Sequence, residues 1–192
     1  MRKIVSKEEG AKKQRRNQLI VGGGLILVML ASTLGYALTR ESKESSEKVI
    51  YNGFEFTKQS GFWSTNIDNY QFFFTYNPKE VPKINSALNP LSSYSGKPLY
   101  IYYENGEAAT EIYRNLFYQN QIAERMQDAC LKGEKCESNS PIKTCEDNFI
   151  IIKESENEKI TQNNSCVFIE GSSENLTKLS DGFLFDIVGI TQ

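Results

Sequence analysis

The side chains that could carry chemistry in this chain are carboxylates and cysteines, because its 192 residues include no histidine. Without an imidazole there is no Ser-His-Asp or Cys-His triad, no H-E-x-x-H zinc site, and no side chain whose ordinary pKa lies near neutral pH. The sequence therefore excludes most common hydrolase mechanisms. It predicts no catalytic residue, no cofactor and no metal site.

The cysteines are Cys130, Cys136, Cys145 and Cys166. An even number of cysteines in an oxidising compartment is typical of disulfides, and four cysteines allow three pairings. We favour Cys130 with Cys136, across a short loop that contains a glycine, and Cys145 with Cys166, at the beginnings of two strands. The gaps of 5, 8 and 20 residues contain no closely spaced pair of the kind that zinc sites use, and no C-x-x-C exchange motif.

Two carboxylate pairs suggest the acid and base of a glycoside hydrolase: Glu146 with Asp147, and Asp181 with Asp186. Their spacing does not distinguish them from solvated surface acids. Three other acids lie near the start of a predicted helix, where negative charge complements the helix dipole: Glu104, Glu107 and Glu111. A carboxylate enzyme is therefore an alternative to a protein without catalysis.

Residues 18–38 are predicted to form a transmembrane helix. The run from Leu19 to Leu38 is uncharged, and a helix of this length would span roughly 30 Å, the hydrocarbon thickness of a bilayer. A cleaved signal peptide is the alternative, with Arg15 and Arg16 as its basic region and small residues near Ala37 as the cleavage site. The small residues of this helix, among them Gly23 and Gly35, would also permit close packing against a second helix.

Residues 1–17 form a basic tail with seven basic and two acidic side chains, a net charge of +5. Since the whole chain carries −2, the remainder carries −7. Positive segments next to a membrane helix stay in the cytoplasm, so the sequence predicts a single-pass protein of the plasma membrane with its C-terminal domain outside. The acidic remainder and the pI of about 5.4 argue against binding to nucleic acid. Asn163 and Asn175 each begin an Asn-x-Ser/Thr triplet and are candidates for N-glycosylation on the outer side.

Residues 39–48 are polar and are predicted to be a linker. Residues 49–192 are predicted to form one extracytoplasmic α+β domain. Ten aromatic residues lie between Tyr51 and Tyr76, and two turn signals divide this stretch into a three-stranded antiparallel meander. Tyr70, Phe72 and Phe74 alternate onto one face, which we interpret as core rather than as a platform for a ligand or glycan.

The second half of the domain is predicted to follow a β-α-β-β-α order and to form a mixed sheet. Short apolar runs at 98–103, 149–152 and 166–169 indicate strands covered on both faces. Apolar residues with helical spacing predict two helices, at 107–131 with Gly133 after its end, and at 173–188 with Ser172 or Ser173 as N-cap and Gly189 after its end.

The basic tail and membrane helix are followed by the strings YNGFEF, NYQFFFTYNPKEV, CEDNFIIIKE and CVFIEG. In this plan the chain resembles uncharacterised small single-pass membrane proteins of archaea, a resemblance that implies no activity, fold or site. The first hypothesis is a membrane-anchored extracytoplasmic binding or assembly module with a protein partner in the membrane or envelope. The alternatives are a cell-envelope enzyme that acts on glycan or peptide, and an accessory subunit of a membrane complex.

Overall fold

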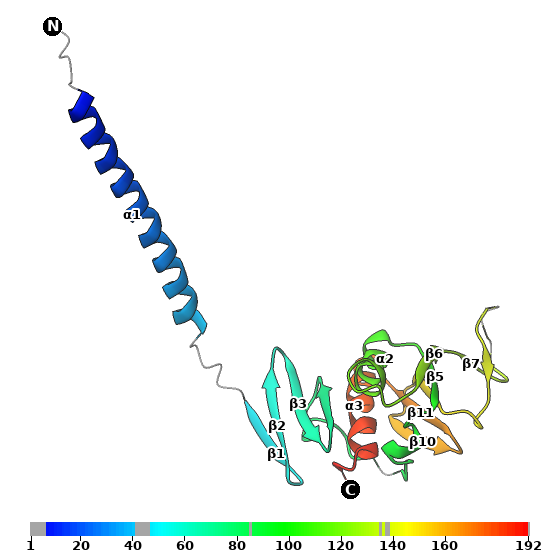
Figure 1. Ribbon diagram of the computed structural model, residues 1–192. Helices are drawn as coiled ribbons and strands as arrows, with labels where there is room; N and C mark the ends of the chain where they lie inside the picture. Colours follow the sequence, from blue (N-terminus) through cyan, green and yellow to red (C-terminus); the bar gives the residue numbers. More distant parts are fainter. Residues whose placement is uncertain (1–6, 41–46, 85, 135, 137–138, 192) are drawn as a thin grey trace. The chain divides into compact units, whose positions relative to one another are not determined.

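The computed structural model describes residues 7–40, 47–84, 86–134, 136 and 139–191 (Figure 1). The chain divides into two compact units, Met1–Ser45 and Ser46–Gln192. The first unit contains helix α1, Lys7–Arg40. Its stretch Gln14–Thr33 has a mean hydropathy of 1.2 and is long and apolar enough to cross a membrane, which confirms the predicted apolar helix. Most of the predicted linker, residues 41–46, lies outside the described residues.

The second unit begins with a four-stranded antiparallel meander in the order β1-β2-β3-β4. Its strands are β1 Lys48–Tyr51, β2 Phe54–Gln59, β3 Phe62–Ile67 and β4 Tyr70–Phe74. The sequence predicted three strands for this meander, and the structure has four. Asn52 and Gly53 have φ angles of 48° and 85°, so they form a tight hairpin turn that separates β1 from β2.

A five-stranded mixed sheet follows, in the order β10-β11-β9-β5-β6. Its strands are β5 Pro98–Tyr103, β6 Arg125–Asp128, β9 Phe149–Glu154, β10 Lys159–Asn163 and β11 Cys166–Gly171. Only β10 is antiparallel to its neighbour, so the predicted α+β class with a mixed sheet is confirmed. The three predicted apolar runs are β5, β9 and β11. A short 3-10 turn, η1 Leu91–Ser93, precedes the sheet, and β7 Cys130–Leu131 pairs with β8 Ile142–Lys143 beside it.

The predicted helix 107–131 is wrong in its second half. Helix α2, Gly106–Tyr113, continues only as a wider turn η2, Arg114–Tyr118, after which the chain becomes extended and forms β6. Gln121, with a φ of 48°, lies in the break. Ala123 and Met126 still pack into the core, so their spacing fitted a helix although the chain there is extended. Gly133 is not a helix end but lies in a turn where Glu134 N–H donates to Leu131 O at 3.1 Å.

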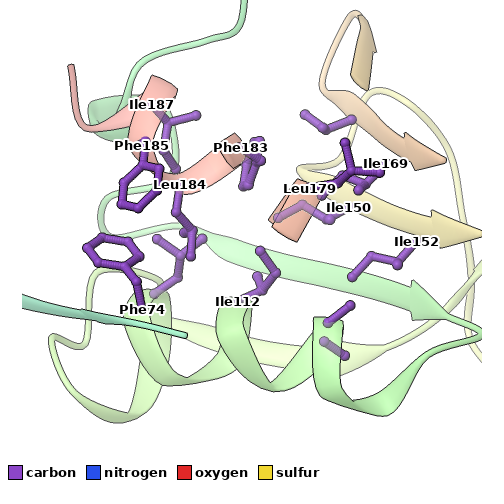
Figure 2. Close-up of a cluster of buried hydrophobic side chains, with 14 of the residues drawn as sticks. Phe74, Ile112, Ile150, Ile152, Ile169, Leu179, Phe183, Leu184, Phe185 and Ile187 are labelled. Carbon is purple, nitrogen blue, oxygen red and sulfur yellow. The ribbon is translucent and has the colours of Figure 1, made fainter. Parts of the chain in front are cut away.

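Helix α3, Leu176–Ile187, forms the centre of the core. Ten of its twelve residues are buried, because helix α2, the meander and the mixed sheet all pack against it. Figure 2 shows Phe185 beside Phe74 of the meander, with ring centroids 4.3 Å apart, while Leu179 lies near Ile169 of the mixed sheet. The predicted N-cap is wrong: the cap position is Asn175, whose side chain makes no capping bond to the helix, and Leu176 N–H donates to Ser172 O at 3.1 Å. Gly189, with a φ of 82°, follows the helix as predicted.

Candidate functional site

The strongest constellation of ionisable groups is a buried carboxyl pair formed by Glu111 of α2 and Asp181 of α3. The two side chains are 2 % and 0 % exposed. Glu111 Oε1 accepts a hydrogen bond from Thr75 Oγ1 at 2.7 Å, and Glu111 Oε2 accepts one from Arg114 Nη1 at 2.8 Å. Asp181 Oδ2 accepts from the backbone N–H of Tyr76 at 2.8 Å. The pair therefore joins both helices to the chain that leaves β4.

The second oxygen of Asp181 has a different environment. Asp181 Oδ1 is buried and receives no hydrogen bond from the described residues. Burial, and then the neighbouring charge of Glu111, raise the pKa of Asp181 well above its usual range. A proton held by Asp181 allows the carboxyl group to donate to Glu111, since two carboxylates alone offer only acceptors. The two acids are thus electrostatically coupled inside the core.

The solvent reaches only the Glu111 side of this pair. A cavity of about 300 Å³ is lined there by Glu111, Arg114 and Phe62 among others, and Asp181 does not line it. The Arg114 guanidinium lies 4.4 Å from the centroid of the Phe62 ring and covers the acid. Glycosidases hold their two carboxyl groups about 5–9.5 Å apart to admit the scissile bond. Glu111 and Asp181 are both buried, and Asp181 does not line the cavity, so the two groups do not face a shared open cleft.

The predicted carboxylates make contacts with other residues in the described part of the chain. Asp147 Oδ1 lies 3.5 Å from Lys143 Nζ, in a turn where Glu146 N–H bonds to Thr144 Oγ1. Asp186 Oδ1 accepts from Thr191 Oγ1 at 3.0 Å near the end of α3, whereas Asp181 lies in the carboxyl pair. Sequence reasoning missed the partnership of Glu111 with Asp181, which no local spacing links. The one available signal was the apolar run Phe183, Leu184 and Phe185, which directly follows Gly182 in the helix that carries Asp181.

A second polar cluster covers the outer edge of β4. The Asn115 side chain accepts from Phe73 N–H at 2.8 Å and donates to Phe73 O at 2.7 Å. Asn120 makes the same two bonds to Gln71, at 3.2 and 3.0 Å. These amides occupy the position of a neighbouring strand, so the backbone of β4 is satisfied without one.

The two disulfides are Cys130–Cys136 and Cys145–Cys166, the pairs favoured from the sequence. Together they hold the segment that carries β7 and β8 against one face of the mixed sheet, where Tyr100, Phe149 and Ile151 form a small second core. No group of three or more potential metal ligands occurs among the residues described.

The glycosylation candidates differ in exposure. Asn163 is exposed at the end of β10, whereas Asn175 is half-buried and donates from Nδ2 to Glu158 Oε1 at 2.5 Å.

A groove of about 760 Å³ is bounded by the α2–η2 segment, by β6 and by residues 139–141. Aromatic rings form much of its wall: Tyr103, Tyr113, Phe117 and Tyr118. Tyr113 Oη donates to Asp128 Oδ1 at 2.7 Å across it. Burial, and then this bond, raise the pKa of Tyr113, so the phenol keeps its proton. Mixed aromatic and polar walls of this kind are typical of binding sites.

No protein-family model, curated protein or solved structure matches this chain.

Proposed function

We propose that this protein is a single-pass protein of the plasma membrane whose C-terminal domain, residues 49–192, lies outside the cytoplasm and binds a partner without catalysis. The observation that carries the proposal is the exposure of α1. Its large apolar side chains are 56–77 % exposed, from Leu19 at 77 % to Leu30 at 56 %. A soluble protein rarely exposes so long an apolar surface, whereas a bilayer would cover it.

Two further features support the orientation. Both disulfides lie in the second unit, and structural disulfides persist in oxidising compartments outside the cytoplasm. The basic tail precedes α1, which favours a cytoplasmic N-terminus. A binding role is supported by the aromatic groove beside β6.

The test is expression of the full chain with a tag at each end, followed by carbonate extraction of the membranes and protease treatment of intact cells. We expect both tags in the membrane pellet on one uncut chain, with the C-terminal tag alone removed by external protease. A variant that lacks residues 18–38 is the control and should leave the pellet. A mature chain that begins near Leu38 would instead support a signal peptide.

Partner binding is tested by crosslinking in native membranes followed by purification through the C-terminal tag. We expect a stoichiometric protein partner joined to the 49–192 domain. Crosslinks confined to α1 would favour the accessory-subunit alternative, and the absence of any crosslinked partner would contradict the binding role.

A further inference from the structure

The β6 edge of the mixed sheet has backbone groups without a strand partner. Within the described part of the chain, β6 pairs with β5 alone. Ala129, directly after β6, donates its N–H to Ile101 O of β5 at 2.9 Å. Successive residues of a strand direct their backbone groups to opposite sides, so Met126 and Asp128 direct theirs away from β5.

The chain itself covers the next part of this same edge. Cys130 N–H donates to Pro141 O at 2.9 Å, and Lys132 N–H donates to Lys143 O at 2.8 Å. These residues continue the alternation of Met126 and Asp128, so β8 lies on the outer side of the edge. β8 therefore pairs with β7, the chain that directly follows β6, and this pairing stops before Asp128.

Two other edges of the domain are covered by different means. Asn115 and Asn120 bond to the edge of β4. Beside β10, Ser86 Oγ donates to Ile160 O, and Asn89 N–H donates to Gln162 Oε1 at 2.7 Å. Uncovered strand edges invite pairing with another chain. These contacts cover the edges of β4 and β10, whereas the outer edge of β6 has no strand partner among the described residues.

The groove beside β6 offers side-chain contacts to an added strand. The Tyr113 and Tyr118 rings have centroids 5.8 Å apart and planes at 25°. Tyr118 is 72 % exposed, so most of its ring lacks the burial by which aromatic side chains stabilise a folded domain. Thr110 and Gln127 add polar groups to the same walls.

We propose that the outer edge of β6 receives an extended segment of a partner polypeptide, which continues the row begun by β8. Its backbone bonds to Met126 and Asp128, and its alternate apolar side chains pack on Tyr113, Phe117 and Tyr118. This inference rests on the proposed binding function and names its site. An extended peptide is the occupant because β8 pairs in that form with the adjoining β7, and because a strand presents backbone donors and acceptors at the spacing of the open groups of Met126 and Asp128.

The test uses the full chain in lipid nanodiscs and a synthetic decapeptide library with Val, Ile, Phe or Tyr at alternate positions and Thr or Ser between them. Binding is followed by residue-resolved amide hydrogen exchange. We expect a bound peptide to protect the amides of Met126 and Asp128 and to leave that of Gln127 unchanged, because Gln127 already faces β5.

The matched variants are Tyr118→Ala in the groove and Ile50→Ala, an exposed apolar residue of another edge strand. Loss of a central aromatic contact should weaken peptide binding about tenfold or more. Ile50→Ala should leave it unchanged, and both variants should unfold at the wild-type temperature because both side chains are exposed.

Four outcomes would overturn the inference: no peptide binds, a peptide binds without protecting these amides, chitohexaose binds through the rings alone, or the amides are protected only by concentration-dependent self-association. None of them affects the proposed function if crosslinking still captures a partner on another surface of the domain.

Discussion

Asp181 is a carboxyl group at the centre of a buried helix, and its proton links the stability of the domain to pH. Its pKa is raised in the folded domain, first by burial and then by Glu111. In the unfolded chain the pKa returns to about 3.9. Above that value the unfolded chain releases a proton that the folded domain retains. The free energy of unfolding therefore falls as pH rises, by about 1.4 kcal/mol per pH unit, until the folded pKa is reached.

Asp181→Asn should remove this dependence on pH. The amide can accept from Tyr76 N–H and donate to Glu111, as the protonated acid does. We expect urea unfolding to show similar stability for variant and wild type at about pH 4, and a growing advantage of the variant towards about pH 8. Asp68→Asn, in an exposed turn, is the control and should follow the wild-type curve. Parallel curves for Asp181→Asn and wild type would show that Asp181 is ionised in the folded domain.

Asn115 illustrates how burial sets the value of a hydrogen bond. Asn115 is 0 % exposed, and its replacement by Ala leaves Phe73 N–H and Phe73 O without partners. We expect a loss of about 2–5 kcal/mol in the free energy of unfolding. Asn120→Ala removes the same pair of bonds at a more exposed position, where water can replace them, and should cost less than about 1 kcal/mol. Equal losses, measured by urea unfolding at one pH, would contradict this account of the β4 edge.

At the scale of elements, the two disulfides should differ in their contribution to stability. Cys145–Cys166 closes a loop of sequence separation 21, and Cys130–Cys136 one of 6. The longer loop restricts the unfolded chain more, by about 1 kcal/mol on the chain-entropy estimate. Cys166 also lies fully buried in β11. We expect the Cys145→Ala/Cys166→Ala variant to lose more unfolding free energy than Cys130→Ala/Cys136→Ala. The reverse order in urea unfolding would show that the shorter loop limits stability.

The sequence correctly predicted the elements whose apolar pattern fits only one kind of secondary structure. The runs at 98–103, 149–152 and 166–169 are apolar at consecutive positions, which suits strands buried on both faces, and each is a strand. The stripe through Ala123 and Met126 was misleading, because Ala123 lies before β6 and Met126 within it, yet both pack into the same core as they would from a helix. Pairing with β5 makes residues 125–128 a strand, and β5 lies too far away in the sequence for a local residue pattern to reveal that contact.

The candidate site depended even more on distant contacts. Glu111 and Asp181 belong to different helices, and each alone has an ordinary surface interpretation. The groove beside β6 could not be predicted either, since it exists only because the helix ends at Tyr118 and the chain turns into an edge strand. The disulfide pairs could be predicted from the sequence, because the even number of cysteines and the lengths of the loops between them leave few pairings to choose from.

At the scale of the whole molecule, the basic tail should set the orientation of the chain in the membrane. Asn163 and Asn175 provide a reporter, because N-glycosylation in microsomes occurs only on the lumenal side, which corresponds to the outside of the cell. We expect wild type to gain mass on translation with microsomes and to return to the unmodified mass after endoglycosidase treatment. The double variant Asn163→Gln/Asn175→Gln should stay unmodified.

Replacement of Lys12, Lys13, Arg15 and Arg16 by Glu should then reduce the glycosylated fraction, because it removes the positive charge that retains the tail in the cytoplasm. Carbonate extraction provides the control, since the altered chain keeps its apolar helix and should stay in the membrane. If the glycosylated fraction stays at the wild-type level, the tail does not direct the topology, and the folded C-terminal domain or the length of α1 must do so instead.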